Sequence, residues 1–307
     1  TATVADAAGV TTATTGNIAL TAVTGISGVG VLTTGNASVD ATTADAVDTA
    51  TSGNITLNVT GAGDVGLSGG NALTIGTATV TNNTANDTAT TGNITVTSAD
   101  RVNNGTASTA LDVSFGAATG GSTNTAGTLT VTTDGGAGAA GEIFVTSGEA
   151  LTVGVLTTAA TAQTVSILTT GDAALTWSGA STLNDTVTLG GAATGVLTIS
   201  AAQTVGSLTG TGNSVVVSGN VTTTASTASG TPSGNITLSA DTTTLTLTNN
   251  LTTGTAAVAD TAGNESATTG AISLTAVTGI SGAGVLTTGA ARSTGADAGG
   301  TDTATRG

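Results

Sequence analysis

The chain has 307 residues and a formal net charge of −15, with three Arg, no Lys, no His and no Cys. So few cations cannot displace the counterions of a phosphate backbone, which argues against a nucleic-acid partner. Without Cys and His, disulfides, thiolate metal sites and imidazole catalysis are excluded. Hydrophobic residues make up 38% of the chain but aromatic residues only 1%. Any core must therefore be thin and built from Ala, Val, Leu and Ile.

A short motif recurs along the chain. Its pattern is Ser/Thr-Gly-Asn-Ile, then a small residue, then Leu or Val. It occurs at residues 15–20, 52–57, 91–96 and 233–238, with variants at 126–131, 194–199 and 269–274. We expect its Gly to open a turn in which positive φ is cheap, and the alternating apolar residues to form a half-buried strand. One short strand cannot bury its apolar face alone, so the repetition predicts stacking of neighbouring copies.

The spacing of the motif indicates the length of the stacked unit. Gly16, Gly53 and Gly92 are 37 and 39 residues apart, and Gly234 and Gly270 are 36 apart. Polar stretches rich in Thr, Ala, Asn and Asp precede these Gly residues, at the same position in each interval. This predicts loops on one edge of a solenoid. The sequence leaves open whether each interval holds one coil with a loop or two tight coils.

Two internal matches indicate a larger organisation. Residues 162–179 match 202–219 at an offset of 40, in a segment with few acidic loops. Residues 1–53 match 255–307 without a gap at an offset of 254. The second match predicts that the chain is a window of a longer array with a 254-residue unit. The alternative is a natural protein with two related ends.

The composition and rhythm predict an all-β fold, namely a right-handed parallel β-helix. Thr, Val, Gly and Asn dominate, while strong helix formers other than Ala and Leu are scarce. The hand follows from the preference of parallel crossover connections. We expect one continuous, elongated solenoid over residues 1–307, with loop-decorated coils over 1–127 and 221–307 and tighter coils over 128–220.

Equivalent residues of successive coils stack in such a fold. We expect the Asn residues of the motif to form a ladder along one corner, with side-chain amides bonding coil to coil. The ladder residues are Asn17, Asn54, Asn93 and Asn235. The alternative is that Asn follows Gly because it tolerates turns. We expect the apolar residues of the motif to point into the lumen: Ile18, Leu20, Ile55, Leu57, Ile94, Val96, Ile236, Leu238, Ile272 and Leu274.

The residues around the motif resemble a known family. Residues 53–57 read Gly-Asn-Ile-Thr-Leu, residues 21–28 read Thr-Ala-Val-Thr-Gly-Ile-Ser-Gly, and residues 31–35 read Val-Leu-Thr-Thr-Gly. In composition and rhythm, over nearly the whole chain, they resemble the repeat tracts of large bacterial filamentous-haemagglutinin-like surface and secreted proteins. The resemblance implies a right-handed parallel β-helix on or outside the cell, serving as a stalk, adhesin shaft or filament. It carries over no functional residue, because those tracts share no catalytic motif.

A carbohydrate-active β-helix enzyme is the rival interpretation from another class. A hydrolase uses two carboxylates at about 5 to 9.5 Å from each other. The candidate pairs are Asp100 with Asp112, near Arg101, and Glu142 with Glu149, around Phe144. We favour a solvated surface role for them, because neither pair lies beside aromatic platforms for sugar rings.

Acidic residues in the polar stretches suggest weak calcium binding. Asp45, Asp48 and Asp87 are the candidate ligands, and other Asp of this edge are Asp40, Asp260, Asp297 and Asp302. A string of hydrated carboxylates could bind Ca²⁺, but no EF-hand or nonapeptide calcium motif is present. We favour a solubilising edge without a cofactor.

An ice-binding solenoid is a third interpretation. Rows of Thr such as Thr128, Thr130 and Thr132, or Thr244, Thr246 and Thr248, alternate along the expected strands. Ice binding requires the same Thr spacing on consecutive coils, and the Thr pattern drifts between repeats.

The sequence therefore predicts a structural, adhesive repeat protein and not an enzyme. We expect it to be extracellular or on the cell surface, forming a rigid shaft or fibre. Its expected partner is itself, end to end or as a covalent array, with surface or matrix glycans as further candidates. No apolar run approaches the roughly 18 residues that span a bilayer, so we expect no membrane insertion.

Overall fold

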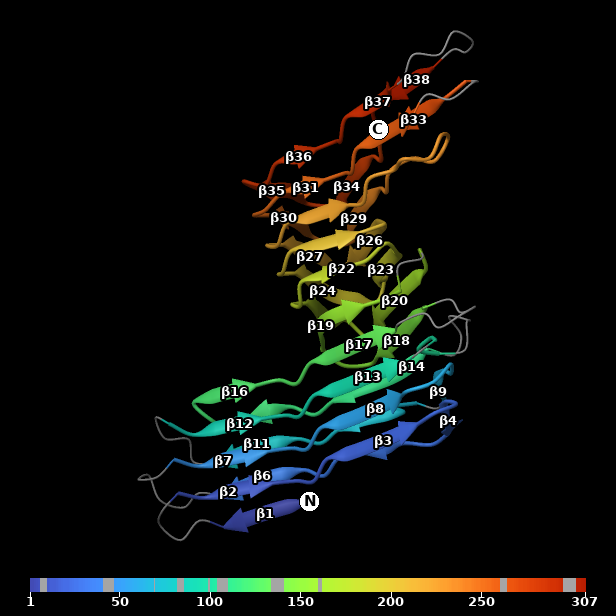
Figure 1. The fold of residues 1–307 in the computed structure, drawn as a ribbon. Coiled ribbons are helices and arrows are strands. Elements are labelled where there is room, and N and C mark those ends of the chain that lie inside the picture. The colour runs from blue at the N-terminus through green and yellow to red at the C-terminus, as the bar shows by residue number, and fades with distance from the viewer. Residues whose placement is uncertain are drawn as a thin grey trace. The chain divides into compact units, whose positions relative to one another are not determined.

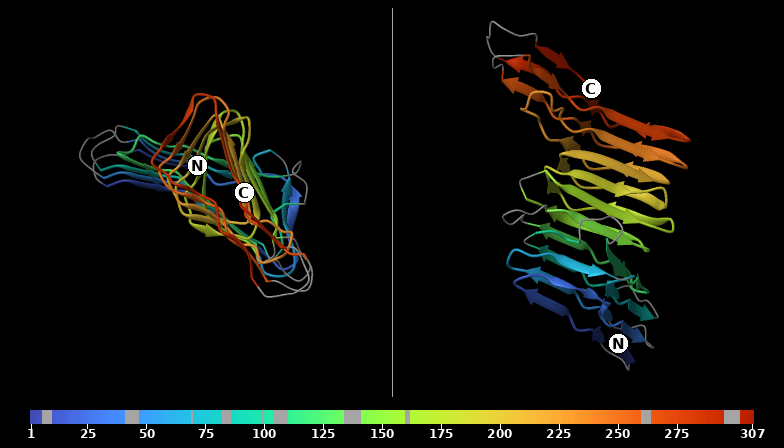
Figure 2. Two further views of the ribbon diagram at one scale, coloured as in Figure 1. Left: turned by 90° about the horizontal axis from the view of Figure 1, so that it is seen from above. Right: turned by 90° about the vertical axis from the view of Figure 1, so that its right-hand side faces the viewer.

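The computed structural model describes residues 1–5, 10–40, 47–68, 70–81, 86–98, 100–103, 110–133, 141–159, 162–259, 264–294 and 302–307. These residues form strands and turns and contain no helix, so the all-β prediction is confirmed. The chain divides into two compact units, unit 1 (Thr1–Val155) and unit 2 (Leu156–Gly307). Within each unit, mostly parallel strands lie one above another in stacked sheets, as in a β-solenoid (Figures 1 and 2).

The described strands of unit 1 build four stacked sheets. Sheet A contains β1 (Ala2–Ala5), β6 (Ala37–Asp40), β11 (Ala78–Thr81) and β15 (Ala118–Thr119). Sheet B contains β2 (Thr12–Thr14), β7 (Thr49–Thr51), β12 (Thr88–Thr90) and β16 (Thr123–Thr125). Sheet C contains β3 (Ile18–Ala22), β8 (Ile55–Val59), β13 (Ile94–Ser98) and β17 (Leu129–Thr133). Sheet D contains β5 (Leu32–Thr33), β10 (Leu73–Ile75), β14 (Leu111–Phe115) and β18 (Ile143–Ser147). In addition β4 (Ile26–Val29) pairs with β9 (Val65–Ser68), and β19 (Leu151–Thr157) crosses the boundary between the units.

Strand register gives the length of each coil in unit 1. Ile18 pairs with Ile55, Ile55 with Ile94, and Ile94 with Leu129, so the coils contain 37, 39 and 35 residues. The chain passes through sheets C, D, A and B before it returns to sheet C. Each copy of the motif therefore corresponds to one long coil, which answers the question that the sequence left open.

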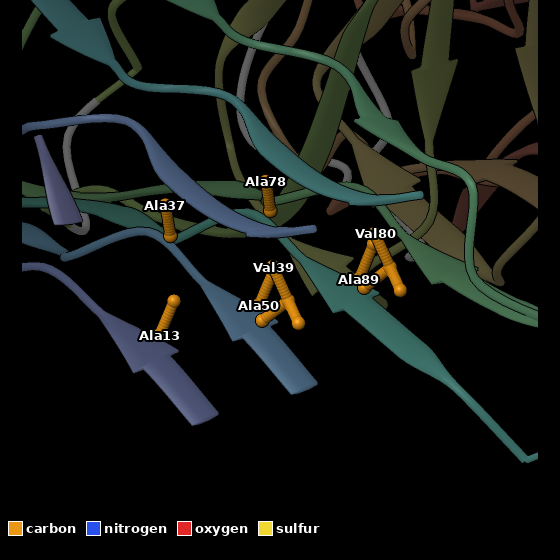
Figure 3. Packing of buried hydrophobic residues seen from close by; sticks show 7 residues of the cluster. All are labelled: Ala13, Ala37, Val39, Ala50, Ala78, Val80 and Ala89. Atoms are coloured by element: carbon orange, nitrogen blue, oxygen red, sulfur yellow. The ribbon is translucent and has the colours of Figure 1, made fainter. Parts of the chain in front are cut away.

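Sheets A and B pack face to face with a core of very small side chains. Ala13, Ala37, Val39, Ala50, Ala78, Val80 and Ala89 form one cluster with exposures of 0–1%. Figure 3 shows these side chains between the strands of the two sheets. Ala permits close packing of the sheets, because no larger side chain holds them apart. This two-layered part of unit 1 accounts for much of the length of each coil.

The lumen residues of unit 1 fall into two groups. Ile55, Leu57, Ile94 and Val96 have an exposure of 0% and lie between paired strands. In β3, Ile18 is half-buried. Leu20 departs from the lumen prediction, with an exposure of 38%, because β3 is the outermost described strand of sheet C.

Unit 2 contains three sheets of similar construction. The first includes β20 (Thr164–Thr169), β23 (Thr186–Gly190), β26 (Ser207–Gly212), β29 (Ile236–Ala240) and β34 (Ile272–Ala276). The next includes β21 (Ala173–Trp177), β24 (Thr194–Ile199), β27 (Ser214–Val217), β30 (Thr244–Leu247) and β35 (Gly279–Gly282). The third consists of β22 (Ser181–Thr182), β25 (Gln203–Val205), β28 (Val221–Thr223), β31 (Leu251–Thr252) and β36 (Leu286–Thr287). Two further pairs are β32 (Ala256–Ala259) with β37 (Ala291–Thr294) and β33 (Ser266–Thr268) with β38 (Thr303–Thr305).

Coil length changes within unit 2. Leu175 pairs with Leu197 and Leu197 with Val215, which gives tight coils of 22 and 18 residues. Val215 pairs with Leu245 and Leu245 with Ile280, which gives coils of 30 and 35 residues. The 40-residue offset in the sequence is therefore the length of two tight coils.

The lumen residues of unit 2 also differ between inner and outer strands. Ile236 and Leu238 in β29 have an exposure of 0%, as does Trp177 in β21. Ile272 and Leu274 are only half-buried, because β34 is the last described strand of its sheet. Interior strands thus carry the buried core, and the outermost strands leave part of their apolar face exposed.

Candidate functional site

The residues Ser/Thr, Gly and Asn of the motif lie at a corner between sheets B and C of unit 1. We call them the corner triad, at residues 15–17, 52–54 and 91–93, with an equivalent in unit 2 at residues 233–235. The first member is a buried hydroxyl: Ser52 and Thr91 are each 1% exposed. No side chain of the triad is charged. The triad links one coil to the next, and each of its residues does this in a different way.

The hydroxyl of the triad accepts a hydrogen bond from the Gly of the next coil. The Gly53 N–H donates to Thr15 Oγ1 at 2.8 Å, Gly92 N–H to Ser52 Oγ at 3.0 Å, and Gly127 N–H to Thr91 Oγ1 at 2.8 Å. The same bond recurs at other corners, for Gly76 to Thr34, Gly254 to Thr223, Gly270 to Ser233, Gly289 to Thr253 and Gly307 to Thr269. These Gly N–H groups would otherwise be left without a partner at the corner, at a free-energy cost.

The Gly of the triad is required for close approach and not for its φ. We expected positive φ here, and this was wrong: the glycines with positive φ include Gly25 and Gly120 but none of the triad. A Cβ on Gly53 would collide with the carbonyl oxygen of Gly16, and a Cβ on Gly92 with that of Gly53. Successive corners therefore stack backbone on backbone, which only Gly permits.

The Asn of the triad accepts a backbone hydrogen bond with its side-chain oxygen. The Asn54 N–H donates to Asn17 Oδ1 at 2.8 Å, and the Asn93 N–H donates to Asn54 Oδ1 at 2.7 Å. This row of Asn side chains ends in the next coil at Thr128, whose N–H donates to Asn93 Oδ1 at 2.9 Å. In unit 2, the Ala271 N–H donates to Asn235 Oδ1 at 2.8 Å. The side-chain amide of each Asn thus bonds from coil to coil, and its partner is a backbone N–H of the next coil.

Three further Asn residues do the same at other corners and were missed. Asn36 accepts from the Thr77 N–H at 2.9 Å, Asn220 from the Asn250 N–H at 3.2 Å, and Asn250 from the Val285 N–H at 3.0 Å. A usable signal existed, because each of these Asn directly precedes a strand. None of these three Asn is followed by Ile, so the Gly-Asn-Ile motif does not include them.

Thr91→Val tests the hydroxyl of the triad. The substitution keeps the shape of the side chain but leaves the Gly127 N–H without its acceptor, so we expect the free energy of unfolding to fall by about 1–3 kcal/mol. Thr90→Val is the matched control, because Thr90 lies in β12 with its hydroxyl outside the corner ladder. Urea denaturation of both variants measures the difference. Equal stability of the two variants would show that the corner bond contributes nothing.

The calcium candidates lie in a different environment from the one expected. Asp48 and Asp87 are 1% and 0% exposed, so they are not hydrated edge carboxylates. Asp48 Oδ1 accepts from the Thr11 N–H at 3.1 Å, and Asp87 Oδ1 accepts from the Asp48 N–H at 3.0 Å. Asp45 lies outside the described residues. Among the residues that the structure describes, no group of three or more Asp or Glu side chains is placed to hold a metal ion.

Asp100, one residue of the first pair of enzyme candidates, lies next to a file of charged residues that runs from coil to coil. Asp64, Arg101 and Glu142 each precede one of the bridged residues Val65, Val102 and Ile143, and Arg101 Nε lies 3.1 Å from Asp64 Oδ2. Asp100 lies beside this file: burial, the Asp64 carboxylate and Glu142 raise its pKa, and Arg101 opposes them. Asp64 was not among the residues predicted from the sequence, because its proximity to Arg101 depends on the length of the coil between them.

The other carboxylate candidates have separate partners. Asp112 Oδ2 accepts a hydrogen bond from the Asn71 N–H at 2.7 Å, one coil away. Glu149 Oε2 accepts one from the Ser114 hydroxyl at 2.9 Å. Phe144 is 9% exposed and belongs to the core. The structure therefore groups Asp100 with Asp64 and Glu142, and not in either pair that the sequence suggested.

Asp185 gives a prediction on pH dependence. It is 0% exposed and accepts hydrogen bonds from the Thr158 hydroxyl and from the Gln163 N–H. Burial raises the pKa of its carboxyl, against the lowering effect of these bonds. A raised pKa in the folded state gives a stabilising contribution that is complete below the ordinary Asp pKa of about 3.9 and is lost as pH rises through the folded value.

We expect Asp185→Asn to remove this part of the pH dependence. The free energy of unfolding of the parent chain should fall relative to that of the variant between acid and neutral pH. Urea denaturation across this range measures both curves. Two parallel curves would contradict the assignment to Asp185.

Comparison with protein-family models, curated proteins and solved structures finds no match to this chain. In the described part of the chain, no helix is long and apolar enough to cross a membrane.

Proposed function

We propose that this chain is a segment of a right-handed parallel β-helix that works as the rigid shaft of an extracellular or surface-displayed bacterial fibre. The observation that carries the proposal is the corner triad, which joins coil to coil by two hydrogen bonds and one close backbone contact. The right hand is supported by the general preference of parallel crossovers. Its role is mechanical and not enzymatic.

The construction of each unit supports a load-bearing role. Backbone ladders, buried hydroxyls and Asn files all run from coil to coil, so each coil is held by its neighbours. In such stacked repeats stability is approximately a sum over neighbouring interfaces. A pull along the axis would then be resisted one interface at a time.

We further propose that the shaft continues as an array, covalently or by end-to-end contact between copies. The support is the match of residues 1–53 to 255–307, which places the same Thr-Gly pair of the corner and the same small-residue core at both positions, with Ala271 at the place of Asn17. Cell-surface or matrix glycans are the other candidate partners. The proposed shaft works without a cofactor.

Single-molecule pulling tests the mechanical proposal. Loss of one long coil releases about 13 nm of chain, and loss of one tight coil releases about 7 nm. We expect force steps of these two sizes. Thr91→Val should lower the force of the steps that involve its coil. Unfolding of each unit in a single step, with no increment of coil size, would contradict the proposal.

A further inference from the structure

Sheet B of unit 1 presents a two-dimensional array of threonines, which we call the threonine face. It consists of Thr12, Thr14, Thr49, Thr51, Thr88, Thr90, Thr123 and Thr125. Thr12, Thr49, Thr88 and Thr123 form one file in register, and Thr14, Thr51, Thr90 and Thr125 form a second. In β2, β7 and β12 the residues between the two files are Ala13, Ala50 and Ala89, which are buried at 0–1% exposure, so the Thr side chains of these strands point away from the core. In β16 the central residue is Asn124, and all three residues of the strand are exposed.

The register of the threonine face is kept although the coils differ in length. Thr12, Thr49, Thr88 and Thr123 are separated by 37, 39 and 35 residues, yet they pair directly. The spacing of Thr along the sequence varies because the coils differ in length. The Thr residues nevertheless lie directly above one another in the sheet. This removes the reason that counted against an ordered Thr surface.

The spacing of the face follows from strand geometry. Alternate residues of a parallel strand lie about 6.6 Å apart, and neighbouring strands lie about 4.8 Å apart. Thr is stiff at χ1, so its hydroxyl and methyl groups hold fixed positions. The result is a regular rectangular net of hydroxyl and methyl groups.

The hydroxyls of the face are free, in contrast to those of the corner. Thr15, Ser52 and Thr91 each accept a bond from the next coil. None of the eight hydroxyls of the threonine face bonds to another residue that the structure describes. The four strands contain no charged residue. Unit 1 thus contains two kinds of Thr. The corner Thr bond one coil to the next, whereas coil stacking does not explain the Thr of the threonine face.

The array continues onto sheet C. Figure 1 shows β7 leading directly into β8, and β12 into β13, on the same side of unit 1. Thr56, Thr95 and Thr130 form a third file, with Thr97 and Thr132 beside them in a fourth. In unit 2 the pattern recurs where Ser266 pairs with Thr303 and Thr268 with Thr305.

From this geometry we infer that the threonine face binds ice. Its ligand must be uncharged, must both donate and accept hydrogen bonds, and must repeat in two dimensions, because the face has these properties. A small molecule has no such repeat, and a glycan chain repeats in one dimension and is held by aromatic platforms that this face lacks. Planes of ice repeat their oxygen atoms on nets with two unequal spacings of this size. A rigid face bears little ordering cost on binding, so many weak contacts add up.

Slow growth of an ice hemisphere in a solution of the chain tests the inference. We expect the 307-residue chain to enter the ice, whereas an unrelated soluble protein is excluded. Thr90→Lys places a charge in the centre of the face and should abolish incorporation. Thr79→Lys, on sheet A, is the matched control and should enter the ice like the parent chain. Circular dichroism checks that each variant is folded, and Thr51→Lys replaces Thr90→Lys if the latter does not fold.

Three results would overturn the inference. The first is exclusion of the parent chain from ice. The second is undiminished incorporation of a folded Thr90→Lys or Thr51→Lys chain, which would move binding to another surface. The third is adsorption to crystalline cellulose with the same dependence on Thr90, which would assign the face to a glycan.

Discussion

Replacing Ile55 with Asp is expected to lower the free energy of unfolding by about 3–5 kcal/mol. Ile55 is 0% exposed and lies in sheet C between Ile18 of the preceding coil and Ile94 of the next. A carboxylate at this position would find only apolar neighbours along its file, so it would be buried without a partner. Urea denaturation followed by circular dichroism measures the loss.

Thr56→Asp is the control for this substitution. Thr56 is the next residue of β8, it is exposed, and it pairs with Thr95 on the outer side of the sheet. The same charge there remains hydrated, and we expect a change within about 0.5 kcal/mol. A similar loss in both variants would mean that the register of β8 is wrong.

Replacing Gly92 with Ala is expected to lower the free energy of unfolding by about 3 kcal/mol. The added Cβ meets the carbonyl oxygen of Gly53, which belongs to the backbone of the preceding corner and cannot rotate away. The two coils must separate at this corner, and the Gly92 N–H bond to Ser52 then lengthens. Hydrogen exchange at the amide of Gly92 reports this local loss, alongside urea denaturation for the global one.

Gly66→Ala is the matched control for Gly92→Ala. Gly66 lies in β9, and a Cβ on it would have no other atom within 4 Å. The substitution restricts the unfolded chain and should change stability by less than about 1 kcal/mol. If Gly92→Ala were as mild as Gly66→Ala, the close stacking of corners would be refuted.

The fold class was predictable because strand periodicity and coil stacking are local properties of the sequence. Ile55 and Leu57 alternate with polar residues, and this alternation gives both the strand and the buried face. Coil length was not predictable in the same way. Two tight coils of 22 and 18 residues look like one 40-residue repeat until their strands are paired.

The residues of the corner triad could be predicted from the sequence, but the hydrogen bonds and backbone contacts that they make could not. The pattern Ser-Gly-Asn at residues 52–54 marked the corner, yet the roles of Ser and Gly depend on the coil above and below. The Gly92 N–H reaches Ser52 across 40 positions of sequence, and the stacked carbonyl of Gly53 is equally remote. The charged file of Asp64, Arg101 and Glu142 was missed for the same reason.

An experimental density map that resolves single strands tests the stacking of the corner triads most directly. In unit 1 we expect rungs about 4.8 Å apart, with Gly16, Gly53 and Gly92 stacked at one corner on three successive rungs. The Asn17, Asn54 and Asn93 side chains should follow them in a parallel file. Two rungs between Gly53 and Gly92, or a corner at which these glycines do not stack, would contradict the account.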